Sequence, residues 1–193
     1  YIPLLVRQGI QLILEAPNAL LGLCSRFGGE VTLITQGSPI QAFDYHCPMM
    51  SLAFVFKTTL SNIPSAPYLT VDPSRKHLWQ TIKKTRIYNV ALVWSGSSAH
   101  KNDAHRSINL TLLLPLFDLP VQFHCLQQDI RPHDRIQLTQ LPQIASYCEQ
   151  LRDFEDTAAL IDAMDLIISV DTSVAHLAGA LGKPVWILLP YAP

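Results

Sequence analysis

Residues 165–190 constrain the fold more than any other part of the sequence, because they predict a complete strand–helix–strand unit. Residues 166–170 are an apolar-rich run, typical of a parallel strand covered on both faces. Residues 174–181 are rich in Ala and Leu and predict a helix, which Gly182 ends. Residues 185–189 then form a second apolar strand. Such a unit has a right-handed crossover and predicts an α/β fold with a parallel sheet.

The turn between the first strand and the helix carries the expected chemistry. Asp171, Thr172 and Ser173 follow the strand at once, and all three residue types are preferred at helix N-caps. A helix N-terminus at the carboxyl end of a parallel strand presents free N–H groups and a positive dipole end, which suit a diphosphate. His176 lies one turn further on, within reach of the same anion. Spacing alone leaves an equal alternative, an ordinary capped helix in which Asp171 only caps.

The order of residues in this turn resembles a known family. Asp171, Thr172, Ser173, His176 and Leu177 reproduce the Asp-Thr-(Ser or Gly)-x-x-His-Leu turn of bacterial heptosyltransferase-like (family 9-like) glycosyltransferases. The chain is most similar to the glycosyltransferase domain found downstream of tetratricopeptide repeats. The resemblance extends over the whole chain, most strongly in its second half. It implies that this turn binds the diphosphate of a nucleotide sugar.

Composition bounds the other possibilities. The 193 residues are 49 % hydrophobic and 15 % charged, which indicates one large or two small globular domains rather than disorder. A net charge of −1 offers no basic field for nucleic acid. No apolar run is long enough for a transmembrane helix, and the first residues lack the pattern of a signal peptide, so a cytoplasmic protein is expected.

Cysteine and histidine spacing predicts no metal site and no resident cofactor. The cysteines are widely separated and are expected to be reduced thiols, although a pair of disulfides stays open. They are Cys24, Cys47, Cys125 and Cys148. His100 and His105 stand five residues apart in a polar segment, which is a poor pattern for metal ligands.

The chain is predicted to form two Rossmann-like domains, over residues 1–80 and 81–193. The first 35 residues alternate helix and strand, with strands at 11–15 and 31–35, which implies parallel pairing. The resemblance implies the GT-B architecture, in which the two domains face each other across a cleft. A parallel sheet normally begins with a strand, and none is predicted at the start of this chain. The N-terminal, acceptor-side domain is therefore expected to be incomplete.

A second element of the donor site is predicted after the strand at residues 89–94. Ser95 and Gly96 leave the carboxyl end of that strand and open a long polar loop that contains Lys101 and Arg106. Cations at this position stabilise the charge that develops on a departing diphosphate. The resemblance includes a Lys in this loop, which assigns Lys101 to the site. For Arg106, diphosphate contact and a solvent-facing charge stay equal alternatives.

Three residues are weaker candidates for contact with the nucleoside. Gln127 follows the strand predicted at residues 121–126 and so lies at a carboxyl edge. In the resembled family the base and ribose lie against the loop that here holds Asp153 and Phe154, although Phe154 is equally well a buried loop aromatic. A helix is predicted next, over residues 158–164, with its N-cap at Asp156 or Thr157.

His46 is a candidate for the cleft between the domains. It stands in an Asp-Tyr-His-Cys-Pro segment, and the resembled family has a similar His-Cys-Pro element in its N-terminal domain. The alternative is a histidine whose ring is satisfied by backbone groups at a strand end. A nucleophilic role for Cys47 is rejected, because no orienting group accompanies the pair.

The function predicted from these residues is metal-independent glycosyl transfer from a nucleotide-diphosphate sugar to an unknown glycan, lipid or protein acceptor. No catalytic base is identified, so binding without turnover is one expectation for this segment. A second is a non-catalytic nucleotide-sugar-binding or interaction module attached to a repeat domain. A sugar-nucleotide epimerase would need paired carboxylates, which we do not locate. A hydrolase that uses Ser173, His176 and Asp171 lacks the Gly-x-Ser-x-Gly elbow.

Overall fold

The computed structural model describes residues 1–83 and 86–191, and the chain divides into two compact units. Unit 1 is Tyr1–Thr70 and unit 2 is Val71–Pro193. Each unit contains its own parallel sheet, so the α/β class and the two separate sheets agree with the sequence prediction. The units divide at residue 70 rather than at the predicted residue 80, because the helical segment after residue 72 packs on unit 2. The facing arrangement of two domains stays a prediction.

Unit 1 is built on a two-stranded parallel sheet. In chain order it contains α1 (Ile2–Arg7), β1 (Leu12–Ala16), α2 (Leu21–Cys24), β2 (Val31–Thr35) and α3 (Leu52–Val55). The sequence predicts one helix over residues 17–27, but the structure has three short pieces, with 3₁₀ turns on each side of α2 (Asn18–Leu20 and Ser25–Phe27). Gly22 within α2 and Ser25 just after it lower the helix propensity of the segment, which favours short pieces over one regular helix. A small core of Ile2, Leu14 and Val31 holds α1 against the sheet.

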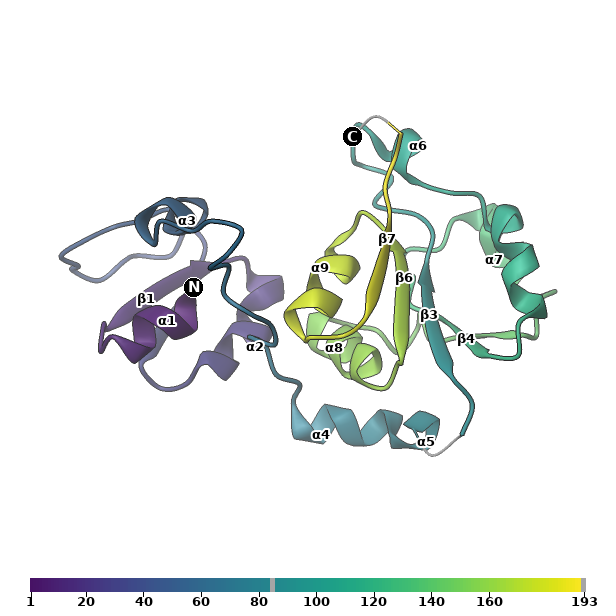
Figure 1. The fold of residues 1–193 in the computed structure, drawn as a ribbon, viewed down its shortest axis with the longest axis horizontal. Coiled ribbons are helices and arrows are strands. Elements are labelled where there is room, and N and C mark those ends of the chain that lie inside the picture. The colour runs from purple at the N-terminus through teal and green to yellow at the C-terminus, as the bar shows by residue number, and fades with distance from the viewer. Residues whose placement is uncertain (84–85, 192–193) are drawn as a thin grey trace. The chain divides into compact units, whose positions relative to one another are not determined.

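Unit 2 contains a five-stranded, entirely parallel sheet in the order β5-β4-β3-β6-β7 (Figure 1). Its strands are β3 (Asn89–Val93), β4 (Gln122–Cys125), β5 (Ile144–Ser146), β6 (Leu166–Val170) and β7 (Val185–Leu188). The longer helices are η5 (a 3₁₀ helix, Leu110–Asp118), α7 (Pro132–Leu138), α8 (Phe154–Asp162) and α9 (Ser173–Ala180). The shorter ones are α4 (Pro73–Lys76), η4 (3₁₀, His77–Trp79), α5 (Gln80–Lys83) and α6 (Asp103–Arg106). No helix in the described part of the chain is both long and apolar enough to cross a membrane.

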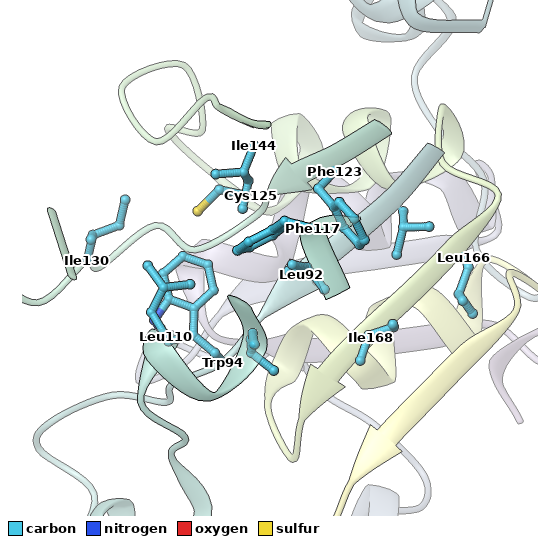
Figure 2. Close-up of a cluster of buried hydrophobic side chains, with 12 residues drawn as sticks. Leu92, Trp94, Leu110, Phe117, Phe123, Cys125, Ile130, Ile144, Leu166 and Ile168 are labelled. Atoms are coloured by element: carbon cyan, nitrogen blue, oxygen red, sulfur yellow. The ribbon is translucent and has the colours of Figure 1, made fainter. Parts of the chain in front are cut away.

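Helical segments cover both faces of the larger sheet, which explains why its two central strands, β3 and β6, are mostly apolar. All five residues of β3 are buried, and so are all five of β6. Figure 1 shows α8 and α9 on one side of these strands and α7 on the other. Figure 2 shows the core on the η5 side, where Leu92 of β3 and Trp94, just after that strand, pack with Leu110 and Phe117.

The sequence predicts a helix over residues 74–85 whose charged side chains, Lys76, Lys83 and Lys84 among them, form a solvated face. The structure shows that charged side chains of this segment pair with α8, so the face is only partly solvated. The Arg75 Nη1 atom lies 2.7 Å from Asp153 Oδ1 and 2.5 Å from Asp156 Oδ1. The Lys76 Nζ atom lies 2.9 Å from Asp162 Oδ2. Charge periodicity showed a polar face but not that α8 offers a row of carboxylates to it. Lys83 and Lys84, assigned to the same face, lie outside the described side chains.

A buried histidine makes the stability of unit 2 depend on pH. His124 is 2 % exposed, its Nε2 atom is 2.9 Å from Asn89 Oδ1, and its ring stacks on Tyr147. Burial lowers the pKa of His124 to about 4. The unfolded chain, with a histidine pKa of about 6.5, therefore binds a proton that the folded chain does not bind between these two values.

We expect the free energy of unfolding of unit 2 to fall as the pH is lowered from 6.5 to 4, with His124 contributing on the order of 1–2 kcal/mol. Urea unfolding of the wild type and of His124→Gln at pH 7, 5.5 and 4 isolates this contribution, because the carboxylates are common to both. The wild-type advantage should shrink with falling pH. A difference that is constant across the three pH values would contradict the assignment.

Candidate functional site

The strand order of unit 2 places a topological switch between β3 and β6. From β3 the chain crosses to β4, and from β6 it crosses to β7, so the two adjacent strands lead away in opposite directions. Open α/β sheets bind ligands at such a point, outside the carboxyl ends of the strands. The turn after β3 contains Ser95 and Gly96, and the turn after β6 contains Asp171 and Thr172. The structure thus brings both predicted donor-site segments to one edge of the sheet.

The turn after β6 leads directly into α9. Thr172 is the N-cap, with an extended backbone, but its side chain makes no cap hydrogen bond. Its Oγ1 atom instead lies 3.0 Å from Ser169 Oγ. The N–H groups of Ser173 and Val174 donate to no described residue, because the first turn of a helix has no internal acceptor for them. The turn therefore keeps free donors and the positive end of the α9 dipole.

His176 and Asp171 stand together at this helix start. The His176 Nε2 atom lies 3.6 Å from Asp171 Oδ1, and the two side chains are 76 % and 52 % exposed. Both side chains are open to solvent, so neither is buried in the packing of unit 2. The imidazole is thus placed to contact an anion that sits on the α9 N-terminus.

Arg106 connects the two turns. Its Nη1 atom donates a 3.1 Å hydrogen bond to the Asp171 carbonyl oxygen, and its side chain is only 17 % exposed. Its guanidinium lies on Gly96, where an added Cβ would overlap the Nη2 atom. Arg106 is therefore more than a solvent-facing charge, and its contact with a diphosphate stays a prediction. Lys101 is exposed, and no hydrogen bond or ion pair joins its side chain to another described residue.

Close contact between Gly96 and Arg106 leads to a prediction of opposite signs for two Gly→Ala substitutions. Gly96→Ala should displace the guanidinium and break its bond to Asp171, which lowers the free energy of unfolding of unit 2 by about 1–2 kcal/mol. Gly179→Ala, in α9 with open space around the added methyl, should raise it by about 0.5–1 kcal/mol. Urea unfolding followed by tryptophan fluorescence measures both, because every tryptophan lies in unit 2. Stabilisation by Gly96→Ala would contradict the described packing.

The side chains of Ser95 and Gln127 are buried and contact each other. Gln127 Oε1 accepts hydrogen bonds of 3.2 Å from the N–H groups of Trp94 and Ser95. Its Nε2 atom donates to Ser95 Oγ and, at 3.1 Å, to the Asp129 carbonyl oxygen. Gln127 and Ser95 are 3 % and 4 % exposed. The structure therefore uses both side chains to hold the turn after β3, and contact of Gln127 with a nucleoside stays a prediction.

Asp153 and Phe154 form the start of α8, four residues earlier than the predicted helix. Asp153 is the N-cap, and its Oδ1 atom accepts a 2.8 Å hydrogen bond from the Asp156 N–H, so the predicted caps at Asp156 and Thr157 are wrong. Burial alone would raise the pKa of Asp153, but the Asp156 amide and the Arg75 guanidinium hold it below its usual value. Phe154 is half-buried. Contact of either residue with the nucleoside stays a prediction.

Three residues that support the turn after β3 were not predicted from the sequence. Asp103 accepts hydrogen bonds from Arg131 Nη2 and, at 2.7 Å, from Ser107 Oγ. The Ser107 oxygen in turn accepts from Gly96 N–H and from Arg131 Nη2, at 3.1 Å each. These residues belong to no motif, and Arg131 comes from the loop after β4 whereas Asp103 and Ser107 follow β3, so no local pattern indicated their contact.

His46 lies in unit 1 and is exposed. Its ring centroid is 6.3 Å from that of Phe43, and the two rings are tilted by 49°. The structure gives its ring no backbone partner among the described residues, so the role expected at a cleft stays a prediction. In the described part of the chain, no three His, Cys, Asp or Glu side chains are grouped so that they could hold a metal ion.

Comparison with known proteins singles out the segment that carries the Asp171 turn. Residues 140–189 match the model of glycosyltransferase family 9 (heptosyltransferase). The match covers the complete path from β5 to β7 and leaves out the loop with Lys101 and Arg106. The resemblance expected over the whole chain is thus supported for this segment. No curated protein matches the chain.

Two solved structures are similar to the chain, each over 65 % of its length and with a TM-score of 0.47. One is a family 9 glycosyl transferase from Veillonella parvula, at 12 % identity. The other is the ADP-heptose lipopolysaccharide heptosyltransferase II of Escherichia coli, at 17 % identity. The chain spans 38 % and 41 % of the lengths of these two proteins.

Proposed function

We propose that unit 2 is the donor-binding part of a glycosyltransferase that uses a nucleotide-diphosphate sugar. The observation that carries this proposal is the Asp171 turn at the β3–β6 switch, because it is both the segment that matches the family and the place where an open α/β sheet binds ligands. The free amides of Ser173 and Val174, with the α9 dipole, suit one phosphate group. His176 and Lys101 are exposed at the same edge and suit its oxygens.

The proposed chemistry follows from where charge develops. Breaking the bond between the sugar and the diphosphate leaves negative charge on the departing nucleoside diphosphate. Preorganised N–H donors and cations stabilise this charge before and during bond cleavage. The α9 N-terminus, Lys101 and the Arg106 guanidinium supply that stabilisation, so we propose that transfer needs no metal ion.

We also propose roles for unit 1 and for the acceptor. Unit 1 would take the acceptor side and supply His46, and the acceptor would be a glycan, lipid or protein in the bacterial cytoplasm. The second candidate is a nucleotide-sugar-binding module attached to tetratricopeptide repeats. It needs only the donor contacts of the Asp171 turn and no catalytic base, and we assign no catalytic base to this chain.

Calorimetric titration of the intact chain with uridine, adenosine and guanosine diphosphates and with the matching monophosphates tests donor binding. We expect one diphosphate to bind about tenfold or more tightly than its monophosphate, since the second phosphate gains charge-assisted hydrogen bonds. Equal affinity for both, or no binding of any, would remove the proposal. Release of the nucleoside diphosphate from its sugar donor on addition of acceptor then separates the enzyme from the binding module.

A further inference from the structure

We infer that Asp103 is a positioning residue, which orients Arg106 and the turn after β3 for the diphosphate; this inference rests on the proposed function. Asp103 is 9 % exposed and stands at the centre of a network that joins three loops at the carboxyl edge of the sheet. Arg131 enters from the loop between β4 and α7, and Arg106 extends to the Asp171 turn.

The contacts of Arg106 show which guanidinium nitrogen can still bind a ligand. Its Nη1 atom is bonded to the Asp171 carbonyl oxygen, and its Nε atom is buried, 3.8 Å from Asp103 Oδ1. The Nη2 atom lies against Gly96 and makes no hydrogen bond to a described residue. The Asp171 carbonyl oxygen thus holds Nη1 by a hydrogen bond, and the Asp103 carboxylate attracts the Nε end at ion-pair distance, which leaves Nη2 for a ligand.

The net charge of the site does not explain why a carboxylate, Asp103, lies beside it. Two arginines and one aspartate give this network a net charge of +1, and a carboxylate beside an anion site weakens the attraction of the site for a diphosphate. Removing that carboxylate would therefore strengthen anion binding if only the total charge mattered. The hydrogen bonds of Asp103 indicate a positioning role instead. Ser107 and Arg131 both donate to its carboxylate, and the Ser107 oxygen in turn accepts from the Gly96 N–H.

The two explanations predict opposite results for Asp103→Asn, which keeps the side-chain shape and raises the net charge by one. If Asp103 positions Arg106, the affinity for the best-binding diphosphate of the panel should fall by about tenfold. The same substitution in an Arg106→Ala background should change the affinity little, because the two residues act as one unit. Asp118→Asn is the matched control. It has the same charge change at an exposed position that ends η5, beside the amino edge of the sheet, and should leave the affinity unchanged.

Hydrogen exchange of the unliganded chain provides a readout that does not depend on the ligand. Amides of residues 96–107 should exchange faster in Asp103→Asn than in the wild type or in Asp118→Asn, while those of β3 and β6 stay protected. Should Asp103→Asn fail to fold, Ser107→Ala removes the link to the Gly96 amide and should show the same two changes to a smaller degree.

The possible results distinguish the positioning role of Asp103 from the proposed donor site. Unchanged or tighter binding by Asp103→Asn, or unchanged exchange of residues 96–107, would overturn the positioning role while His176→Ala still tests the donor site. Failure of the wild type to bind any of the three diphosphates would overturn the donor site and the positioning role together.

Discussion

Replacing Trp94 by Ala is expected to lower the free energy of unfolding of unit 2 by about 3–5 kcal/mol. Trp94 is fully buried and packs within the core on the η5 side of the sheet (Figure 2). Its Nε1 atom also donates a 2.9 Å hydrogen bond to Asp134 Oδ2. Asp134 is 1 % exposed, so the substitution both opens a cavity and removes a donor from a buried carboxylate.

Urea unfolding followed by circular dichroism measures this effect. Trp186→Ala is the matched control, because the same atoms are removed from β7, where the residue is 63 % exposed, and the loss should stay below about 1 kcal/mol. Trp94→Phe keeps most of the packing and should cost about 1–3 kcal/mol for the lost hydrogen bond to Asp134. Similar losses for Trp94→Ala and Trp186→Ala would contradict the placement of the core.

His176→Ala and Lys101→Ala should each weaken nucleoside-diphosphate binding roughly ten- to hundredfold, which corresponds to about 1.5–3 kcal/mol for a polar or charge-assisted contact. Thr172→Ala should cost less, about 1 kcal/mol, because the amides of the α9 N-terminus stay in place. All three side chains lie at the edge of the sheet rather than in its core, so folding should survive each change. Calorimetric titration with the best-binding diphosphate measures the three affinities.

A charge-matched control separates a contact at the site from general attraction. Arg86→Ala also removes one positive charge, but from an exposed position just before β3, at the amino edge of the sheet. It should change the affinity by less than about twofold at physiological salt, because charges beyond a Debye length are screened. A loss equal to that of Lys101→Ala would show that only net charge matters.

Runs rich in apolar residues made the strands of the larger sheet predictable from sequence. The strand expected at residues 166–170 coincides with β6, because a strand buried on both faces is apolar at nearly every position. The strand expected at residues 31–35 coincides with β2 of the smaller sheet. The Asp171 turn was predictable for a related reason, since three capping residues follow a strand directly. The helix α7 was not predicted, because residues 132–138 are mostly polar and show no apolar stripe.

The parts of the candidate site that escaped prediction depend on contacts between loops. Asp103 and Arg131 are 28 residues apart, and neither stands in a pattern that indicates the other. The sequence placed Arg106 at the carboxyl edge of the sheet. Its hydrogen bond to the Asp171 carbonyl oxygen requires β3 and β6 to be neighbours, which the order of elements along the chain does not determine. Strand order within a sheet is a tertiary property, and so is the switch point that it creates.

The central claim is that a nucleoside diphosphate binds on the Asp171 turn at the β3–β6 switch. Amide chemical shifts of the ¹⁵N-labelled intact chain, recorded while the best-binding diphosphate is added, test it most directly. The account predicts saturable shifts at Ser173, Val174 and His176 and at Gly96 across the switch, with β5 and unit 1 much less affected. Saturable shifts confined to other segments, with the amides of residues 172–176 unmoved, would contradict it.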